Sequence, residues 1–157
     1  MRAALNDNTA QIVEILVKSS ALVSARDAMG WTALMHAARR RQENVEVVRL
    51  LVAAGSDVNA SHKQGGTPLS IAAYRGHARV ARFLLDAGAN VNTADTAGWT
   101  PLICSSMHGH VEIVKMLLES RANVHAADRL GRTALVMARL NRHPSVEQML
   151  VQAGARY

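Results

Sequence analysis

The sequence predicts an all-α repeat solenoid, built from helix–turn–helix units that are joined by hairpin-like loops. The first observation is a recurring tripeptide, Gly-x-Thr, with a period of 33 to 35 residues, which ends at Thr32, Thr67, Thr100 and Thr133. A second signature keeps this period: a Leu-Leu pair, a small-residue turn and Val-Asn or Val-His, beginning at Leu50, Leu84 and Leu117. Third, aromatic residues make up 3% of the chain and apolar residues 49%, which favours thin, closely packed helices over sheets.

The first half of each unit is predicted to be a short helix. In the second unit Thr67 stands at the expected N-cap, where its hydroxyl accepts a hydrogen bond from an otherwise unpaired backbone N–H. Pro68 follows at the first helical position, which needs no N–H donor. The helix is expected over residues 68–74, and Gly76-His77 ends it and turns the chain.

The second half of each unit is predicted to be a longer helix, over residues 78–87 in the second unit. Val80, Phe83 and Leu84 recur there at helical spacing, and Gly88 ends the helix. Residues 90–98 then fit an extended turn or hairpin that leads to the next unit.

These residues resemble the ankyrin repeat, whose pattern is a turn, Gly-x-Thr-Pro-Leu-His, two antiparallel helices and a Gly-Ala-x-Val-Asn close. The resemblance covers nearly the whole chain and implies an elongated, slightly curved stack, with helices as the outer layer and hairpins projecting at about a right angle to make a concave face. We divide the chain into residues 1–26 (a partial, capping repeat), 27–61, 62–94, 95–127 and 128–157 (the C-terminal repeat).

The sequence also departs from the family pattern. The first full repeat has two extra residues around 39–44, so we expect a lengthened loop between its helices. The histidine that the family carries after Leu is absent, so the polar link that it makes between repeats should be missing; the replacements are Met35, Ser70, Ile103 and Val136. Residues 3–25 align with only the later part of a unit. Either residues 3–5 form a stub of helix or, the alternative we favour, the chain is a piece of a longer protein.

Cysteine content indicates the cellular compartment, and net charge indicates the type of partner. The single cysteine, Cys104, cannot form an internal disulfide, which favours a reducing, intracellular compartment, cytoplasmic or nuclear. The N-terminus lacks the apolar stretch of a signal peptide, and no run approaches the roughly 20 apolar residues of a membrane span. The formal net charge of +6 suits acidic partners, either an acidic protein segment or a nucleic-acid backbone; the alternative is a solvated basic surface without a specific role.

No arrangement of residues indicates catalysis. Cys104 falls at a position that is packed within the repeat. His108 and His110 have no carboxylate or thiol nearby at metal-ligand spacing, and Gly65-Gly66 lacks the spacing of a phosphate-binding loop. We therefore expect no enzyme activity, cofactor, metal or small-molecule substrate.

Residues that vary between units are available for recognition, because the recurring residues build the stack. In the ankyrin family the hairpin tips and the exposed side of the first helix face the concavity. Here these positions hold Trp, Tyr and Arg, the residue types that most often anchor protein interfaces. The predicted partner-binding residues are Met29, Trp31, Arg39, Arg40, Lys63, Gln64, Tyr74, Arg75, Trp99, Met107, His108, Arg129 and Arg132. In the last unit the same positions also hold Leu130, Leu140 and Asn141.

The alternative for these residues is structural: the tryptophans pack on the next hairpin, and Arg39 and Arg40 belong to a solvated loop. The leading interpretation is a protein–protein interaction module, a scaffold or adaptor, whose face suits a partner protein or peptide with an acidic or mixed segment carrying an apolar anchor. Two other functions stay open. One is nucleic-acid binding, through base stacking and phosphate contacts; the other is a regulatory domain of a larger, enzyme-containing protein.

One residue is a candidate for modification. The segment from Leu51 to Asn59 resembles the sequence preferred by an asparaginyl hydroxylase that acts on ankyrin repeats, with Asn59 as the target. The alternative role of Asn59 is hydrogen bonding within the hairpin.

Overall fold

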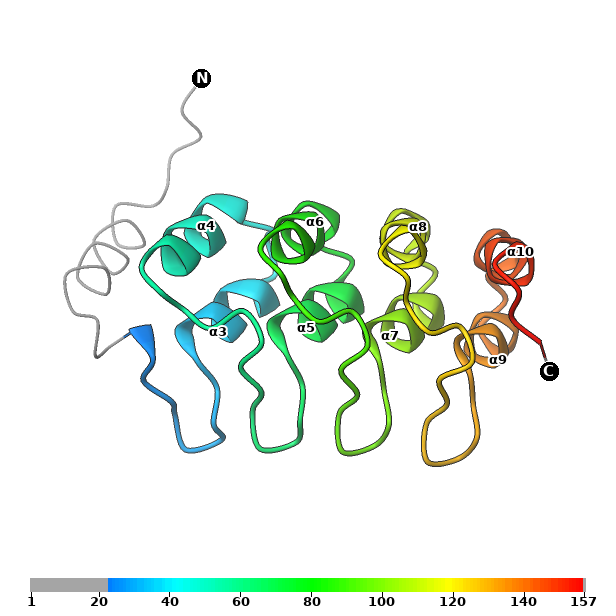
Figure 1. The fold of residues 1–157 in the computed structure, drawn as a ribbon, viewed down its shortest axis with the longest axis horizontal. Coiled ribbons are helices and arrows are strands. Elements are labelled where there is room, and N and C mark those ends of the chain that lie inside the picture. The colour runs from blue at the N-terminus through cyan, green and yellow to red at the C-terminus, as the bar shows by residue number, and fades with distance from the viewer. Residues whose placement is uncertain (1–22, 157) are drawn as a thin grey trace, which may run out of the picture.

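The computed structural model describes residues 23–156, which form eight helices in two layers with hairpin loops along one edge (Figure 1). The inner layer, next to the hairpins, contains α3 (Ala33–Arg39), α5 (Pro68–Arg75), α7 (Pro101–Met107) and α9 (Ala134–Leu140). The outer layer contains α4 (Val45–Ala53), α6 (Ala78–Asp86), α8 (Val111–Glu119) and α10 (Pro144–Gln152). The all-helical repeat fold is thus confirmed for the described residues, whereas most of the predicted partial repeat, including the helix stub at 3–5, lies outside them.

Threonine caps start every inner helix. The hydroxyl of Thr32 accepts a hydrogen bond from the backbone N–H three residues later, and the same bond recurs in the other three repeats, at 3.2–3.4 Å. Thr67 adds a reciprocal bond, because the hydroxyl of Ser70 accepts from the Thr67 N–H at 2.9 Å. Each bond satisfies a donor that the first helical turn leaves without a partner, which fixes where the helix begins.

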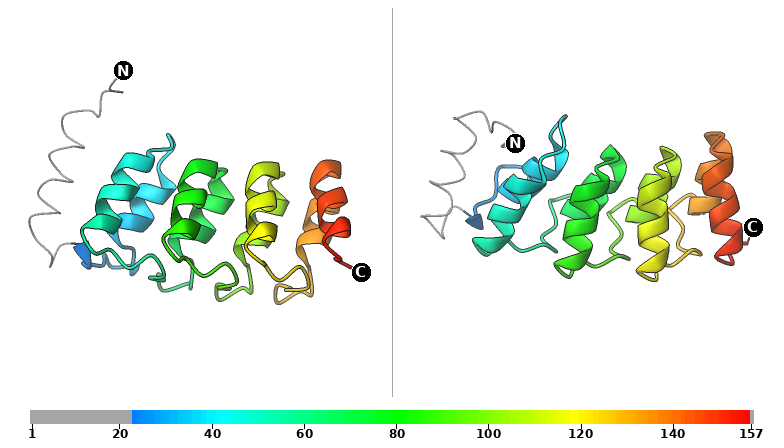
Figure 2. Two further views of the ribbon diagram at one scale, coloured as in Figure 1. Left: turned by 45° about the horizontal axis from the view of Figure 1, so that its top comes forward. Right: turned by 90° about the horizontal axis from the view of Figure 1, so that it is seen from above.

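The core lies between the two layers and runs the length of the stack. Two leucines per repeat are its most buried side chains, each at most 1% exposed: Leu34, Leu69, Leu102 and Leu135 from the inner helices, and Leu51, Leu84, Leu117 and Leu150 from the outer ones. Neighbouring inner helices pack directly on one another, as do neighbouring outer helices (Figure 2). Each repeat therefore buries its apolar face against the next, so the core is built from contacts between neighbouring repeats.

The predicted lengthened loop is confirmed between α3 and α4. It spans residues 40–44, whereas only residues 76–77 separate α5 from α6. The loop is tied to the next repeat, because the carboxylate of Glu43 accepts a hydrogen bond from the Val80 N–H in the first turn of α6, at 2.9 Å. The carboxylate thereby also meets the positive end of that helix.

Polar links between repeats come from other histidines than the one the family pattern places after Leu. Met35 and Ile103, at that position, are fully buried. The rings of His77, His110 and His143 instead donate to main-chain carbonyls of the preceding repeat, at 3.0–3.3 Å; the acceptors are Ala38, Tyr74 and Met107. The Gly-His turn therefore has a role beyond ending the first helix.

Two arginines occupy turn positions where other repeats carry glycine. Arg121 follows α8 with φ 62°, and the equivalent Gly88 after α6 has φ 88°. A side chain in this left-handed region costs about 1–2 kcal/mol relative to the ordinary helical region. We expect Arg121→Gly to raise the free energy of unfolding by about 0.5–1 kcal/mol, measured by urea denaturation. The reciprocal Gly88→Arg, at a site with no other atoms within 4 Å of an added Cβ, should lower it by a similar amount. Equal stability of the parent and both variants would contradict this explanation.

Among the helices between residues 23 and 156, none combines the length and the apolar character that crossing a bilayer requires.

Candidate functional site

The four hairpin loops form a continuous layer, because each tip is bonded to the next. The Lys63 N–H donates to the Met29 carbonyl at 3.1 Å, the Thr96 N–H to the Gln64 carbonyl at 2.8 Å, and the Arg129 N–H to the Ala97 carbonyl at 3.0 Å. These are main-chain bonds, so they hold the tips in place whatever their side chains are. Variable side chains at the tips are thereby presented on a fixed support.

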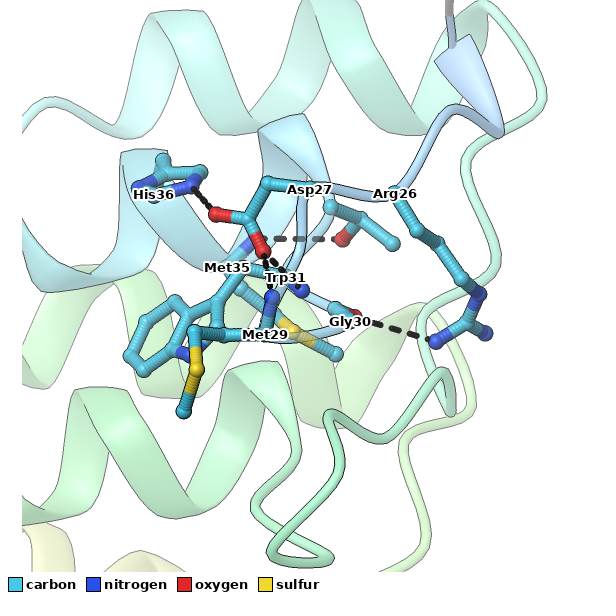
Figure 3. A network of polar contacts seen from close by, with 8 residues as sticks. Arg26, Asp27, Met29, Gly30, Trp31, Met35 and His36 are labelled. Carbon is cyan, nitrogen blue, oxygen red and sulfur yellow. Dashed lines mark hydrogen bonds and ion pairs between the residues drawn. The ribbon is translucent and has the colours of Figure 1, made fainter.

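A side-chain acceptor shapes each hairpin from inside. One carboxylate oxygen of Asp27 accepts from the backbone N–H groups of Met29 and Trp31, both at 2.9 Å, while the other lies 3.0 Å from the His36 ring (Figure 3). Asp95 and Asp128 repeat the pair of backbone bonds two periods and three periods later. The backbone bonds hold the pKa of Asp27 below its ordinary value.

The second hairpin departs from this pattern, and sequence reasoning missed it. His62 stands where the other three repeats have aspartate, and its Nδ1 accepts from the Gln64 N–H at 3.1 Å. Its ring also stacks on Trp31, with centroids 4.8 Å apart and planes 5° apart. The signal was present in the sequence: aspartate recurs at the repeat period at positions 27, 95 and 128, and position 62 breaks it.

The tryptophans are engaged within the stack. Besides the contact with His62, the guanidinium carbon of Arg39 lies 4.8 Å from the Trp31 ring centroid, a cation–π contact. Both Trp31 and Trp99 are half-buried and pack against the core. The structural alternative for these residues is thus realised in part, and direct contact with a partner stays a prediction for both.

The other predicted binding residues are more open to solvent. We call the surface formed by the hairpin tips and the C-terminal ends of the inner helices the inner face. The exposed residues on it are Met29, Arg39, Arg40, Lys63, Gln64, Tyr74, Arg75, His108 and Arg129. Met107 is half-buried. Arg132 is held by an ion pair with the buried carboxylate of Asp128, at 2.6 Å.

The most exposed apolar side chains also lie on this face, at the last repeat. Leu130 at the hairpin tip is 76% exposed, and Leu140 at the end of α9 is 66% exposed. They occupy the tip and helix-end positions that Met29 and Tyr74 hold in earlier repeats, which are 51% and 44% exposed.

The family follows from this geometry and from comparison with known proteins. A family profile described as "Ankyrin repeats (3 copies)" matches residues 1–95 and again 88–157. The chain belongs to the ankyrin-repeat family. Ankyrin repeats serve as non-catalytic, protein-binding units. Membership of the family therefore indicates that this domain is a protein-interaction module.

Curated relatives extend well beyond this domain. The chain is 34% identical over 79 residues to the "NAD-capped RNA hydrolase NUDT12" of Homo sapiens, and equally to those of Pongo abelii and Macaca fascicularis. These matches cover 50% of this chain and 17% of each relative. The ankyrin domain thus spans a small part of the length of the hydrolases that it resembles.

Among residues 23–156, Cys104 lies in the core and His110 is bonded within the stack. Burial raises the pKa of the Cys104 thiol to about 12, with Asp95 adding to the effect, so the residue stays protonated in the core. The rings of His108 and His110 lie 5.8 Å apart, but His110 is bonded to the Tyr74 carbonyl. Among residues 23–156, no three His, Cys, Asp or Glu side chains are grouped as a metal would require.

Asn59 is already bonded across the repeat boundary. Its amide oxygen accepts from the Asn90 N–H at 2.7 Å, and its amide nitrogen donates to the Gly88 carbonyl at 3.2 Å. Both bonds join the first full repeat to the second, which gives Asn59 a structural role. Its hydroxylation stays a prediction.

Three histidines, His62, His108 and His110, predict acid sensitivity. Burial lowers the pKa values of His62, His108 and His110 below the ordinary 6.5. The unfolded chain therefore binds protons first as the pH falls below about 6.5, so stability is complete above that pH and declines below it. Asp95 and Asp27 act to raise the pKa of His62, but the effect of burial is larger, so this pKa is still lowered. A proton on Nδ1 of His62 would also remove the acceptor for the Gln64 N–H.

We expect urea midpoints to fall between pH 7 and pH 5, and the fall to be smaller in His62→Asn, whose amide oxygen accepts the same bond without titrating. His125→Asn serves as a control, because His125 is an exposed residue outside these contacts. A midpoint that is flat over this range, or a fall of the same size in His62→Asn, would contradict the assignment.

Proposed function

We propose that this ankyrin domain binds an acidic protein segment on its inner face. The observation that carries the proposal is a set of exposed cations that form no ion pair within residues 23–156: Arg40, Lys63, Arg75 and Arg129. The nearby carboxylates already accept hydrogen bonds from backbone N–H groups. Those of Asp27, Asp95 and Asp128 accept backbone N–H bonds within their hairpins, and Glu43 accepts one from α6. The charge of the face is therefore available to a carboxylate from outside.

A protein segment fits this face better than a nucleic acid. Sequence-tolerant binding of single strands relies on open aromatic faces on which bases stack. Here the Trp31 ring already contacts His62 and Arg39, and Trp99 is half-buried. The rings of Tyr74 and His108 pack edge-to-face on each other, with their centroids 4.5 Å apart. Exposed arginine beside apolar side chains is instead the composition of protein interfaces.

The test compares two double variants with equal net charge. Arg40→Glu with Arg75→Glu reverses two cations of the inner face, whereas Arg79→Glu with Lys115→Glu reverses two exposed cations of the outer helices α6 and α8. With a partner captured from cell lysate and then purified, we expect the inner-face variant to bind at least about tenfold more weakly than the parent. The outer-helix variant should bind as the parent does. Equal weakening in both would indicate an effect of net charge alone and would contradict the proposal.

The partial match to NAD-capped RNA hydrolases supports a second proposal: this ankyrin domain is joined to a catalytic domain in a longer protein. Sequencing the complete transcript tests it. A reading frame that continues into a hydrolase domain is expected, and one limited to these repeats would contradict it.

A further inference from the structure

The inner face changes chemical character along the stack. Its helix-end position is filled in turn by Arg39, Tyr74, Met107 and Leu140. The next position along the chain is filled by Arg40, Arg75, His108 and Asn141. From the first full repeat to the last, these two rows pass from cationic through aromatic to apolar and neutral.

Exposure at the apolar end is a property of the face and not only of the end of the stack. Tyr74 holds the helix-end position in the middle of the stack and is still 44% exposed, although another repeat packs beside it. Gln64 and Ala97, at the tip position of the middle repeats, are also exposed. The tip position is therefore exposed in all four repeats, and the helix-end position is exposed in three of them, Met107 being half-buried.

Charge follows the same division. The first two full repeats present Arg39, Arg40, Lys63 and Arg75 on the face. The third presents Thr96, Met107 and His108 at the equivalent positions, where burial and the neighbouring His110 and His143 lower the pKa of His108 and so favour its neutral form. In the fourth, the tip carries Arg129 beside the exposed Leu130, while Arg132 is neutralised by Asp128.

We infer that the occupant of the inner face is a bipartite protein segment, with acidic residues at one end and large apolar residues at the other. The acidic end lies over the first two full repeats and the apolar end over the last two. This inference rests on the proposed function and adds a direction to it. The reverse orientation would bury carboxylates against Leu130 and Leu140 and leave the arginines without a counter-charge, so the face selects one orientation.

The test is a selection of random peptides displayed on phage, run against the whole chain and against two double variants. Arg40→Gln with Arg75→Gln removes charge at one end, and Leu130→Ser with Leu140→Ser removes apolar surface at the other. All four residues are exposed, so both variants should fold, which circular dichroism checks. The parent should enrich peptides in which an acidic run and an apolar run are separated along the sequence.

Binding measurements with synthetic versions of the enriched peptides then show which end of the inner face binds through charge and which through apolar contact. Each double variant should weaken binding by about tenfold. The dependence of affinity on salt should shrink only in the arginine variant, because the leucine variant removes no charge from the face. A nitroxide on the acidic end of the peptide should broaden the amide signals of Arg40 and Arg75 and leave those of Leu140 unaffected.

The outcomes separate the two levels of the proposal. The bipartite inference is overturned if the enriched peptides are acidic throughout, or if they bind the leucine variant as tightly as the parent. Either result leaves the binding of acidic segments intact. A nitroxide effect at Leu140 in place of Arg40 also overturns it. A selection that enriches nothing overturns both the inference and the proposed function.

Discussion

Replacing Gly98 by alanine should lower the free energy of unfolding by about 2–4 kcal/mol. Gly98 has φ 86°, and a Cβ there would lie 2.8 Å from the Cα of Asp128 and 3.2 Å from the carbonyl oxygen of Ala127. The side chain would thus meet the backbone of the next hairpin, which is fixed by its own bonds. Two costs add: backbone strain at a positive φ, and a clash that only a shift of the neighbouring hairpin can relieve. Urea denaturation followed by circular dichroism measures the loss.

Gly131 offers a matched control for this prediction. It holds the same turn position in the last repeat, with φ 73°, but no atom lies within 4 Å of an added Cβ. Gly131→Ala should therefore carry only the backbone cost, about 1–2 kcal/mol. The difference between the two variants isolates the packing of one hairpin on the next. If both variants lost the same stability, the hairpins would not be packed as described.

His77→Ala should lower the free energy of unfolding by about 2–4 kcal/mol, and should separate the first full repeat from the others during unfolding. The His77 ring is only 8% exposed, and its Nδ1 donates to the Ala38 carbonyl at 3.0 Å. This carbonyl belongs to the last turn of α3, where the helix supplies no further N–H donors. The variant leaves both a cavity and an unpaired buried acceptor at the boundary between two repeats.

His143→Ala is the control, because His143 makes the same kind of bond, to the Met107 carbonyl at 3.1 Å, but is only half-buried. The free energy of unfolding should therefore fall less in His143→Ala than in His77→Ala. Both histidines are the N-cap residues of the helices that follow, but neither side chain makes a capping hydrogen bond, so the comparison reports on links between repeats and not on side-chain capping. The measurement is thermal unfolding by calorimetry. A single cooperative transition in His77→Ala with the parent midpoint would contradict the proposed link.

The sequence was sufficient for features that a single repeat determines. The threonine caps, the glycine turns, the buried leucines and the lengthened loop before α4 all follow from local rules applied at one period. The predicted helix ends were close: residues 68–74 were expected where α5 ends at Arg75, and 78–87 where α6 ends at Asp86. Helix ends fray, so a difference of one residue carries no structural meaning.

Features that join two repeats were not predictable in the same way. The stacking of His62 on Trp31 and the histidine bonds to preceding carbonyls join residues up to 39 positions apart. The period says which residues are equivalent, but not how far one repeat is rotated and shifted against the next. These same contacts occupy part of the Trp31 ring, so composition alone gave too simple a picture of how its aromatic surface is used.

The most direct test of the central claim is to map the contact surface on the chain itself. Amide signals of the ankyrin domain, recorded by NMR with and without its purified partner, report which backbone groups change environment on binding. Binding on the inner face should change the signals of the hairpin tips and of the C-terminal ends of α3, α5, α7 and α9, and leave those of the outer helices unchanged. Changes confined to α4, α6, α8 and α10 would contradict it, because binding would then take place on the opposite side of the stack.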